Sequence, residues 1–222
     1  MKDKRMKKNI FALALAVLFL TSCGEQPDFR NPSGAQTLRP EDRPLRLTKF
    51  ERIHGTRYLM ADIREVRSGL NLSSSSSEYG KIRNIAFLDG ETLASTKLFD
   101  TDANVIVSAR EYSAHDASSS ASTGSDAVTQ WLVCQIVKAD TNGDGHMDDS
   151  DQQTIAVTDP SGSGYTEILS GIEENLGMQM LTAGKMLVVY TQKGIKNAAL
   201  IDLGNRKVIS TKALIDLGPN VK

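Results

Sequence analysis

The sequence of 222 residues is poor in the residues and motifs from which catalytic sites are usually recognised. It has three histidines and two cysteines, and it lacks the Gly-x-Ser-x-Gly, His-Glu-x-x-His, phosphate-loop and Cys-x-x-Cys motifs. No histidine lies near Cys134 in the sequence, so Cys134 is predicted to be a small buried apolar residue. These absences favour a protein that is not an enzyme. The alternative is a hydrolase whose catalytic groups come together only in the fold.

A long hydrophobic run is also absent. The longest one, residues 10–20, is too short to span a membrane comfortably but has the length of the apolar part of a secretory signal. Five Lys and Arg residues precede it, and Leu20-Thr-Ser-Cys23 follows. These residues resemble the signal and lipobox of bacterial lipoproteins. The resemblance implies cleavage after residue 22 and acylation of Cys23. Because Gly24 rather than Asp follows, it also implies the outer membrane, facing the periplasm.

The net charge of the chain without its predicted signal peptide argues against anionic partners. Removal of residues 1–22 takes away five of the 26 Lys and Arg and one of the 27 Asp and Glu, so 21 basic and 26 acidic residues remain. A net charge of about −5 argues against binding to nucleic acid and against electrostatic binding to anionic lipid.

With Cys23 acylated, Cys134 has no intramolecular disulfide partner. Residues 23–44 are rich in Pro, Gly and polar residues and are predicted to form a flexible tether.

The remaining residues, 45–222, are predicted to form one all-β domain with a substantial core. One segment is ambiguous, because residues 168–176 place Ile168, Ile172 and Leu176 on one face of a short helix. The predicted strands are residues 57–65, 83–89, 95–99, 104–111, 130–138, 154–159, 165–169, 185–192, 197–202 and 208–212.

An internal repeat organises these strands. Ile85-Ala-Phe-Leu-Asp89, Ile155-Ala-Val-Thr-Asp159 and Ala198-Ala-Leu-Ile-Asp202 share a pattern, and each follows a longer apolar strand. This layout is typical of propeller blades. The segment from Leu181 through Ala199-Leu-Ile-Asp-Leu-Gly204 resembles a TolB-type propeller repeat.

Three blades are fewer than a closed propeller typically needs. The sequence therefore predicts a partial propeller, an open stack of twisted sheets, or an array that closes by pairing with itself. In each case open sheet edges would allow self-association.

The segment 140–151, Asp-Thr-Asn-Gly-Asp-Gly-His-Met-Asp-Asp-Ser-Asp, is the strongest candidate site. Its alternating oxygen-bearing side chains suit a hard cation such as Ca²⁺, and Gly145 stands where a sharp turn is needed. The segment resembles the EF-hand and dockerin type of calcium loop, and would lie between the second and third strands of the middle repeat. The resemblance implies six metal ligands: Asp140, Asn142, Asp144, the carbonyl of His146, Asp148 and Asp151.

Position 12 of the loop is Asp151 rather than the Glu of EF-hands, so its shorter carboxylate would bind through one oxygen. The alternative to a calcium site is an acidic turn between two strands.

The lipoprotein-like N-terminus, the β-repeats and the acidic loop together lead us to expect a calcium-binding, lipid-anchored cell-envelope protein that serves as a structural or protein-interaction scaffold. The sequence does not identify its protein partner.

Overall fold

The computed structural model describes residues 44–66, 79–114, 127–182 and 184–215, and every regular element in them is a β-strand. These strands lie within the compact unit Leu38–Lys222. Nearly all the predicted signal peptide and tether, including Cys23, lies outside the described residues, as does His115. In the described part of the chain, no helix has the length and hydrophobicity needed to cross a membrane.

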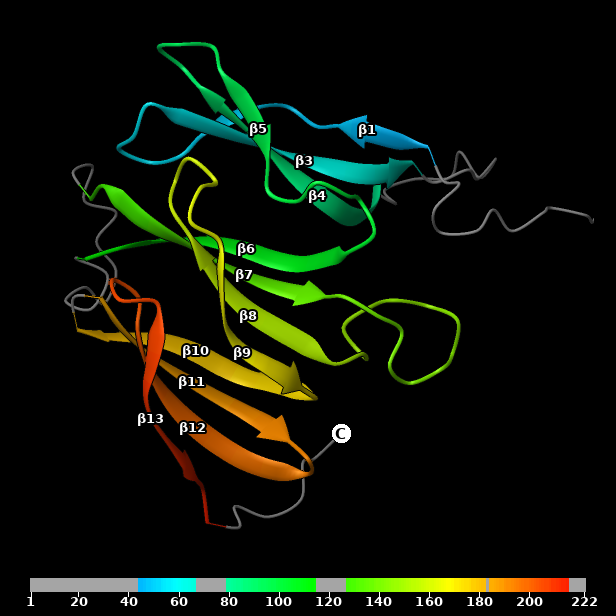
Figure 1. The fold of residues 1–222 in the computed structure, drawn as a ribbon, viewed down its shortest axis with the longest axis vertical. Helices are drawn as coiled ribbons and strands as arrows, with labels where there is room; N and C mark the ends of the chain where they lie inside the picture. The colour runs from blue at the N-terminus through cyan, green and yellow to red at the C-terminus, as the bar shows by residue number, and fades with distance from the viewer. Residues whose placement is uncertain (1–43, 67–78, 115–126, 183, 216–222) are drawn as a thin grey trace, which may run out of the picture. The chain divides into compact units, whose positions relative to one another are not determined.

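The strands form three antiparallel repeats in chain order (Figure 1). Repeat 1 consists of β1 (Leu45–Leu47), β2 (Glu51–Arg52), β3 (Tyr58–Val66), β4 (Tyr79–Asp89) and β5 (Ser95–Lys97). Because β1 and β2 both pair with β3, together they take the place of a first strand.

Repeat 2 consists of β6 (Val105–Ser113), β7 (Thr129–Val137), β8 (Gln153–Thr158) and β9 (Thr166–Ile172). Repeat 3 consists of β10 (Glu174–Thr182), β11 (Lys185–Gln192), β12 (Ile195–Asp202) and β13 (Lys207–Ala213). Repeats 1 and 2 are joined by a single backbone pair, Ile82 with Ile106, whereas repeat 3 is a separate sheet.

The protein is therefore an open, β-propeller-like array of three repeats, and the prediction of an all-β fold is confirmed. In the described residues, no strand of repeat 3 pairs with a strand of repeat 1, so the array is not closed. The helix considered for residues 168–176 is wrong, because these residues end β9 and begin β10. Pairing of β9 with β8 and of β10 with β11 overrides the local helical periodicity.

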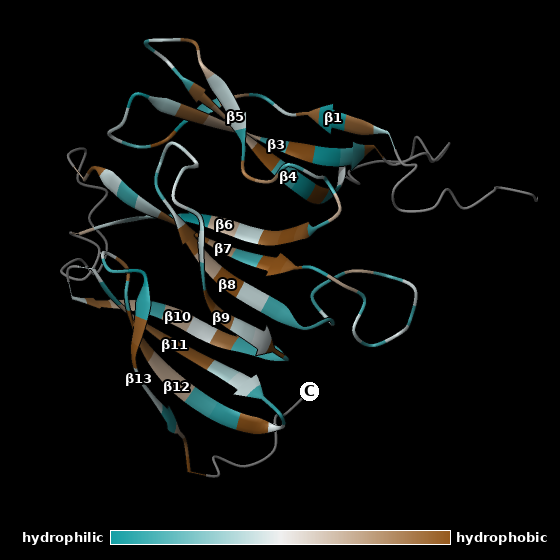
Figure 2. Ribbon diagram, in the orientation of Figure 1, coloured by the Kyte–Doolittle hydropathy of each residue, from teal (hydrophilic) through white to brown (hydrophobic). Residues whose placement is uncertain are grey.

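Two hydrophobic cores lie between successive repeats. Residues from β4, such as Phe87, pack with Leu132, Cys134 and Ile136 of β7 in the first core. In the second, Val133 and Ile155 pack with repeat 3. Both faces of β7 and β8 are therefore buried, which explains the continuous apolar runs Trp131-Leu-Val-Cys134 in β7 and Ile155-Ala-Val157 in β8. Figure 2 shows the alternation of hydrophobic and hydrophilic stretches along the strands around them.

The repeated Asp residues lie where the third strand of each repeat ends: Asp89 and Asp202 are the last residues of β4 and β12, and Asp159 directly follows β8. In repeats 1 and 3 they stabilise the turns that follow. Asp89 accepts hydrogen bonds from the backbone N–H groups of Glu91 and Thr92, and Asp202 accepts one from that of Asn205. Asp89 also pairs with Arg57 of its own repeat at 2.9 Å. Lys185 similarly pairs with Asp202.

The middle repeat uses its Asp differently. Asp159 pairs with Arg206 in the turn between β12 and β13, and the same Arg206 donates to the carbonyl of Gly164. The third copy of the motif thus supports its own turn, whereas the second copy connects repeats 2 and 3.

Candidate functional site

The candidate calcium loop lies between β7 and β8, as predicted. It begins three residues after Val137 and ends with Asp151, two residues before Gln153. The two strands pair in register from Leu132–Thr158 to Val137–Gln153, so both ends of the loop are held by buried sheet. Figure 1 shows the loop extending away from the strands.

The first part of the loop is shaped by short side chains that accept backbone hydrogen bonds. Asp140 Oδ1 and Oδ2 accept the N–H groups of Gly143 and Gly145 at 2.7 and 2.8 Å. Asn142 Oδ1 accepts the N–H of Asp144 at 2.9 Å, and Asp144 Oδ1 accepts that of His146 at 2.7 Å. These are successive side-chain turns of the kind that Asn and Asp favour.

Gly145 has a φ of +81°, which confirms the left-handed conformation predicted for the sharp turn. Gly143, with a φ of +76°, shares it. A Cβ atom at either position would meet no atom within 4 Å. Glycine is therefore favoured by backbone conformation rather than by lack of space.

The carboxylate of Asp151 has no exposed surface and joins the beginning of the loop to its end by hydrogen bonds. Its Oδ1 accepts the N–H groups of Thr141 and Asn142 at 2.6 and 3.2 Å and the hydroxyl of Thr141 at 3.1 Å. Its Oδ2 accepts the N–H of Asp148 at 3.0 Å. Desolvation raises the pKa of this carboxyl, but the hydrogen bonds from Asp148, Thr141 and Asn142 outweigh it, so the pKa lies below its ordinary value. Asp151 is thus charged at neutral pH.

The loop has oxygen atoms of the kind that bind a hard cation, but they do not all point toward one centre. Each carboxylate oxygen has two lone pairs, so the single N–H accepted by each oxygen of Asp140 and by Asp151 Oδ2 leaves capacity for an ion. Asp151 Oδ1, with three donors, is saturated. In the part of the chain that the structure describes, no three His, Cys, Asp or Glu side chains are placed so that they could hold a metal. Ion binding would require a small rearrangement of the loop.

Lys81 of β4 reaches the second half of the loop, a contact that sequence reasoning missed. Its Nζ donates to the carbonyl of Met147 at 2.6 Å and lies 3.8 Å from Asp148 Oδ2. A positive charge from repeat 1 therefore stands beside a predicted metal ligand of repeat 2. No sequence signal marks Lys81, because 66 residues separate it from Met147.

The other singled-out residues have structural roles. Cys134 is buried, and desolvation raises the pKa of its thiol to about 12, so the thiol stays protonated. His54 lies in the turn between β2 and β3, where its backbone N–H, not its imidazole, donates to the carboxylate of Glu111. His146 is exposed in the loop.

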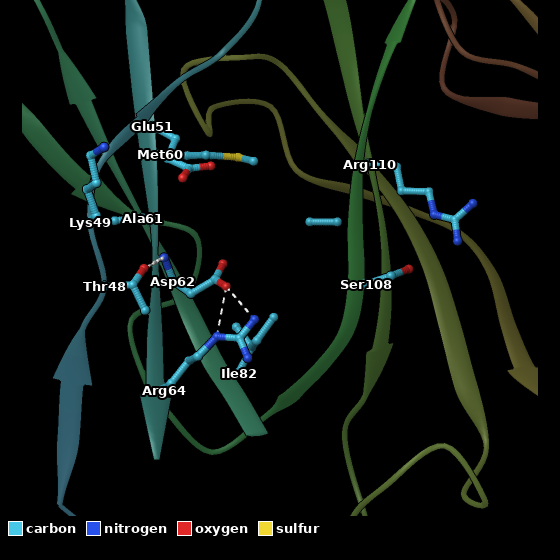
Figure 3. A pocket seen from close by; sticks show the side chains of 11 residues that line it. Thr48, Lys49, Glu51, Met60, Ala61, Asp62, Arg64, Ile82, Ser108 and Arg110 are labelled. Atoms are coloured by element: carbon cyan, nitrogen blue, oxygen red, sulfur yellow. Dashed lines mark hydrogen bonds and ion pairs between the residues drawn. The ribbon is translucent and has the colours of Figure 1, made fainter. Parts of the chain in front are cut away.

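An open pocket of about 580 Å³ lies between repeats 1 and 2 (Figure 3). Figure 3 shows Asp62 and Arg64 of β3 joined by an ion pair of 2.7 Å, with Arg110 and Ser108 projecting from β6 on the other side. Lys49 and Glu51 complete its charged lining. The pocket is open, and apolar residues such as Met60, Ile82 and Ala109 line it together with the charged ones. It could not be predicted from the sequence, because its lining comes from two different repeats.

Buried amides link this pocket to the candidate calcium loop. Ser108 donates to Gln135 Oε1 at 2.7 Å, Gln135 Nε2 donates to Gln153 Oε1 at 3.0 Å, and Gln153 Nε2 donates to the carbonyl of Asp149 at 3.0 Å. These three bonds cross β6, β7 and β8. The backbone of the loop is thus connected by hydrogen bonds to the sheet interior.

Comparison with known proteins identifies no family. No family model matches the chain, and no curated protein matches it. One matching solved structure is the β-propeller domain of the Trilobed protease from Pyrococcus furiosus, described as having an open velcro topology. That match has a TM-score of 0.40 and 11% sequence identity, and covers 78% of this chain and 44% of the other. The chain thus spans less than half the length of that structure.

Proposed function

We propose that this protein is a calcium-binding, lipid-anchored scaffold of the bacterial cell envelope that binds a protein partner. The observation that carries the proposal is the 140–151 loop, in which oxygen donors at the expected positions are combined with a left-handed Gly145. The residues that would hold the ion are Asp140, Asn142, Asp144, His146 through its carbonyl, Asp148 and Asp151.

Charge supports a cation as the ligand. The loop has five carboxylates within twelve residues, at positions 140, 144, 148, 149 and 151. Two carboxylates about 4 Å apart repel by roughly 1 kcal/mol in water and about 4 kcal/mol near a protein surface. A bound divalent ion would remove this repulsion. Because β7 and β8 are buried on both sides, stabilising the loop would stabilise the domain.

Lipid anchoring is supported by the signal-like N-terminus that ends at Cys23, a residue outside the described structure. The acyl chains would provide the membrane affinity, because each buried CH₂ contributes about 0.8 kcal/mol.

The calcium proposal predicts thermal stabilisation. An ion at a hundred times its Kd stabilises the native state by about 2.7 kcal/mol. Extracytoplasmic calcium sites have Kd values of about 0.1–1 mM. For a domain of this size we expect 10 mM Ca²⁺ to raise the Tm by about 5–10 °C for a Kd near 0.1 mM. Mg²⁺ should do much less, because it requires a tight octahedral shell. Scanning calorimetry of the purified chain, with and without each ion, measures both effects.

Two substitutions that each remove one negative charge from the loop make this test specific. Asp144→Ala removes a proposed ligand, whereas Asp149→Ala removes the same charge from a residue that is not a ligand and whose backbone carbonyl keeps its bond to Gln153. We expect Asp144→Ala to abolish the calcium response and Asp149→Ala to retain it. Equal melting of the wild type with and without calcium would reduce the loop to an acidic turn. Equal responses of the two variants would mean a diffuse charge effect.

The anchoring proposal predicts a single acylation site. When the full chain is produced in bacteria fed a palmitate analogue, we expect Cys23→Ala to lose the label completely. Cys134→Ala should keep it, because Cys134 is buried. Label that persists in Cys23→Ala, detected by gel fluorescence, would exclude Cys23 as the anchor.

A further inference from the structure

The three repeats present equivalent faces because their second and third strands pair in the same register. The equivalent pairs are Leu59 with Leu88, Leu132 with Thr158, and Met186 with Ile201. Side chains alternate along a strand, so this register defines two faces in every repeat. We call the face directed at the next repeat the leading face and the opposite one the trailing face.

Within the chain, leading faces pack on trailing faces. The leading face of repeat 2 carries Val133, Ile155 and Val157, all with 0% exposure. These residues share one core with Met186 and Val188 on the trailing face of repeat 3. The first core is arranged in the same way, with Ile85 and Phe87 of repeat 1 packed with repeat 2. Both internal interfaces are therefore of one kind.

Among the residues that the structure describes, the leading face of repeat 3 and the trailing face of repeat 1 have no neighbouring repeat. They correspond to the two sides of the internal interface. On the leading face of repeat 3, Leu187 pairs directly with Leu200 and Val189 with Ala198, and all four residues are only partly buried. Leu187 and Leu200 are the equivalents of Val133 and Val157, which are fully buried in repeat 2. The difference arises because repeat 3 covers the leading face of repeat 2.

On the trailing face of repeat 1, Leu59 and Ile63 of β3 are partly buried, and Leu47 of β1, which pairs with Ile63, is 47% exposed. Their equivalents in repeat 2, such as Leu132 and Ile136, have 0% exposure. Figure 1 shows repeats 1 and 3 on opposite sides of repeat 2.

The faces are better suited to association than the edges. The exposed edge strand β13 carries Lys207 and Lys212, and β5 has only three residues. Charged and short edge strands resist strand pairing. Association through these two edges is therefore disfavoured, whereas in the described residues the leading face of repeat 3 and the trailing face of repeat 1 have no further repeat packed on them.

We propose that two copies of this chain associate into a closed ring of six repeats. The leading face of repeat 3 of each copy packs on the trailing face of repeat 1 of the other copy. A two-fold axis relates these two identical contacts, so the assembly closes. Six repeats fall within the usual range of four to eight blades, whereas the three of one chain do not. The ring requires neither calcium nor the lipid anchor, so its test is independent of the function proposed above.

Sedimentation of the purified full chain in density-matched detergent tests the ring. We expect one species of twice the mass of the chain. Leu200→Lys on the leading face and Leu59→Lys on the trailing face should each give monomers. Leu93→Lys is the matched control, because Leu93 is 74% exposed in the turn between β4 and β5, and this variant should remain a dimer.

A mixing experiment separates this contact from one in which like faces meet. In an equimolar mixture of Leu200→Lys and Leu59→Lys chains, one of the two contacts has both native faces. We therefore expect the mixture to recover dimers that neither variant forms alone. Circular dichroism of each variant confirms that it is folded.

Each other outcome overturns the proposal. A monomeric wild type would mean that the free faces are covered within the chain or by another protein. A series of larger species would mean open, helical growth. Dimers that survive both substitutions, or a mixture that remains monomeric, would place the contact elsewhere.

Discussion

Replacing Arg83 with methionine is expected to destabilise the domain by up to about 3–5 kcal/mol, because it removes a buried positive charge that lies beside the buried carboxylate of Glu65. The side chains of Arg83 and Glu65 are 5% and 4% exposed, and Arg83 Nε lies 3.6 Å from Glu65 Oε1. Arg83 Nε also donates to the carbonyl of Asp102 at 3.1 Å. The measurement is urea unfolding of the purified chain.

Two controls identify the cause. The double variant Arg83→Met/Glu65→Met should lose less stability than either single variant, because apolar side chains of similar volume often replace a buried pair at little cost. Lys138→Met breaks an ion pair that is shorter, 2.8 Å, but whose side chains are 45% and 38% exposed. It should cost less than about 1 kcal/mol. Additive losses in the double variant would show that burial of Glu65 is not what makes Arg83 important.

Substitution of Gly162 with alanine is expected to cost about 2–5 kcal/mol. Gly162 follows β8 and has a φ of +79°, and a Cβ atom there would lie 2.3 Å from Cδ2 of Phe87. The left-handed conformation accounts for about 1–2 kcal/mol and overpacking for about 1–3 kcal/mol. Because Phe87 belongs to repeat 1, the cost falls on the contact between repeats 1 and 2. Urea unfolding with a constant m value measures it.

Gly194→Ala separates the two contributions. Gly194 has a φ of +70°, but a Cβ atom there would meet nothing within 4 Å, so only the conformational cost applies. The double variant Gly162→Ala/Phe87→Leu should also cost less than the sum of its single substitutions, because the smaller side chain makes room. Equal costs at Gly162 and Gly194 would contradict the close packing on Phe87.

The local features of this protein were predictable because they depend on neighbours in the chain. Alternating apolar residues and Asp-containing turns predicted ten of the strands and their grouping into repeats, since both patterns act over a few residues. The loop 140–151 was likewise predictable, because Asp140 and Asn142 bond to backbone within five residues and Gly145 needs only its own φ. The same local signal was misleading at residues 168–176, where pairing with other strands decided the structure.

What the sequence alone determined is thus the all-β class, the repeat, the place of the loop and the apolar nature of β7 and β8. Only the tertiary structure decided which charges meet, as in Lys81 with Asp148 and Arg83 with Glu65, and which apolar faces remain open. The physical reason is distance along the chain. A turn or an alternating strand is specified by adjacent residues, whereas the burial of a charge or a face depends on whatever distant segment packs against it. The partly exposed Leu187 and Leu200 and the buried Val133 and Val157 are all apolar residues at equivalent positions, and only the presence of a following repeat distinguishes them.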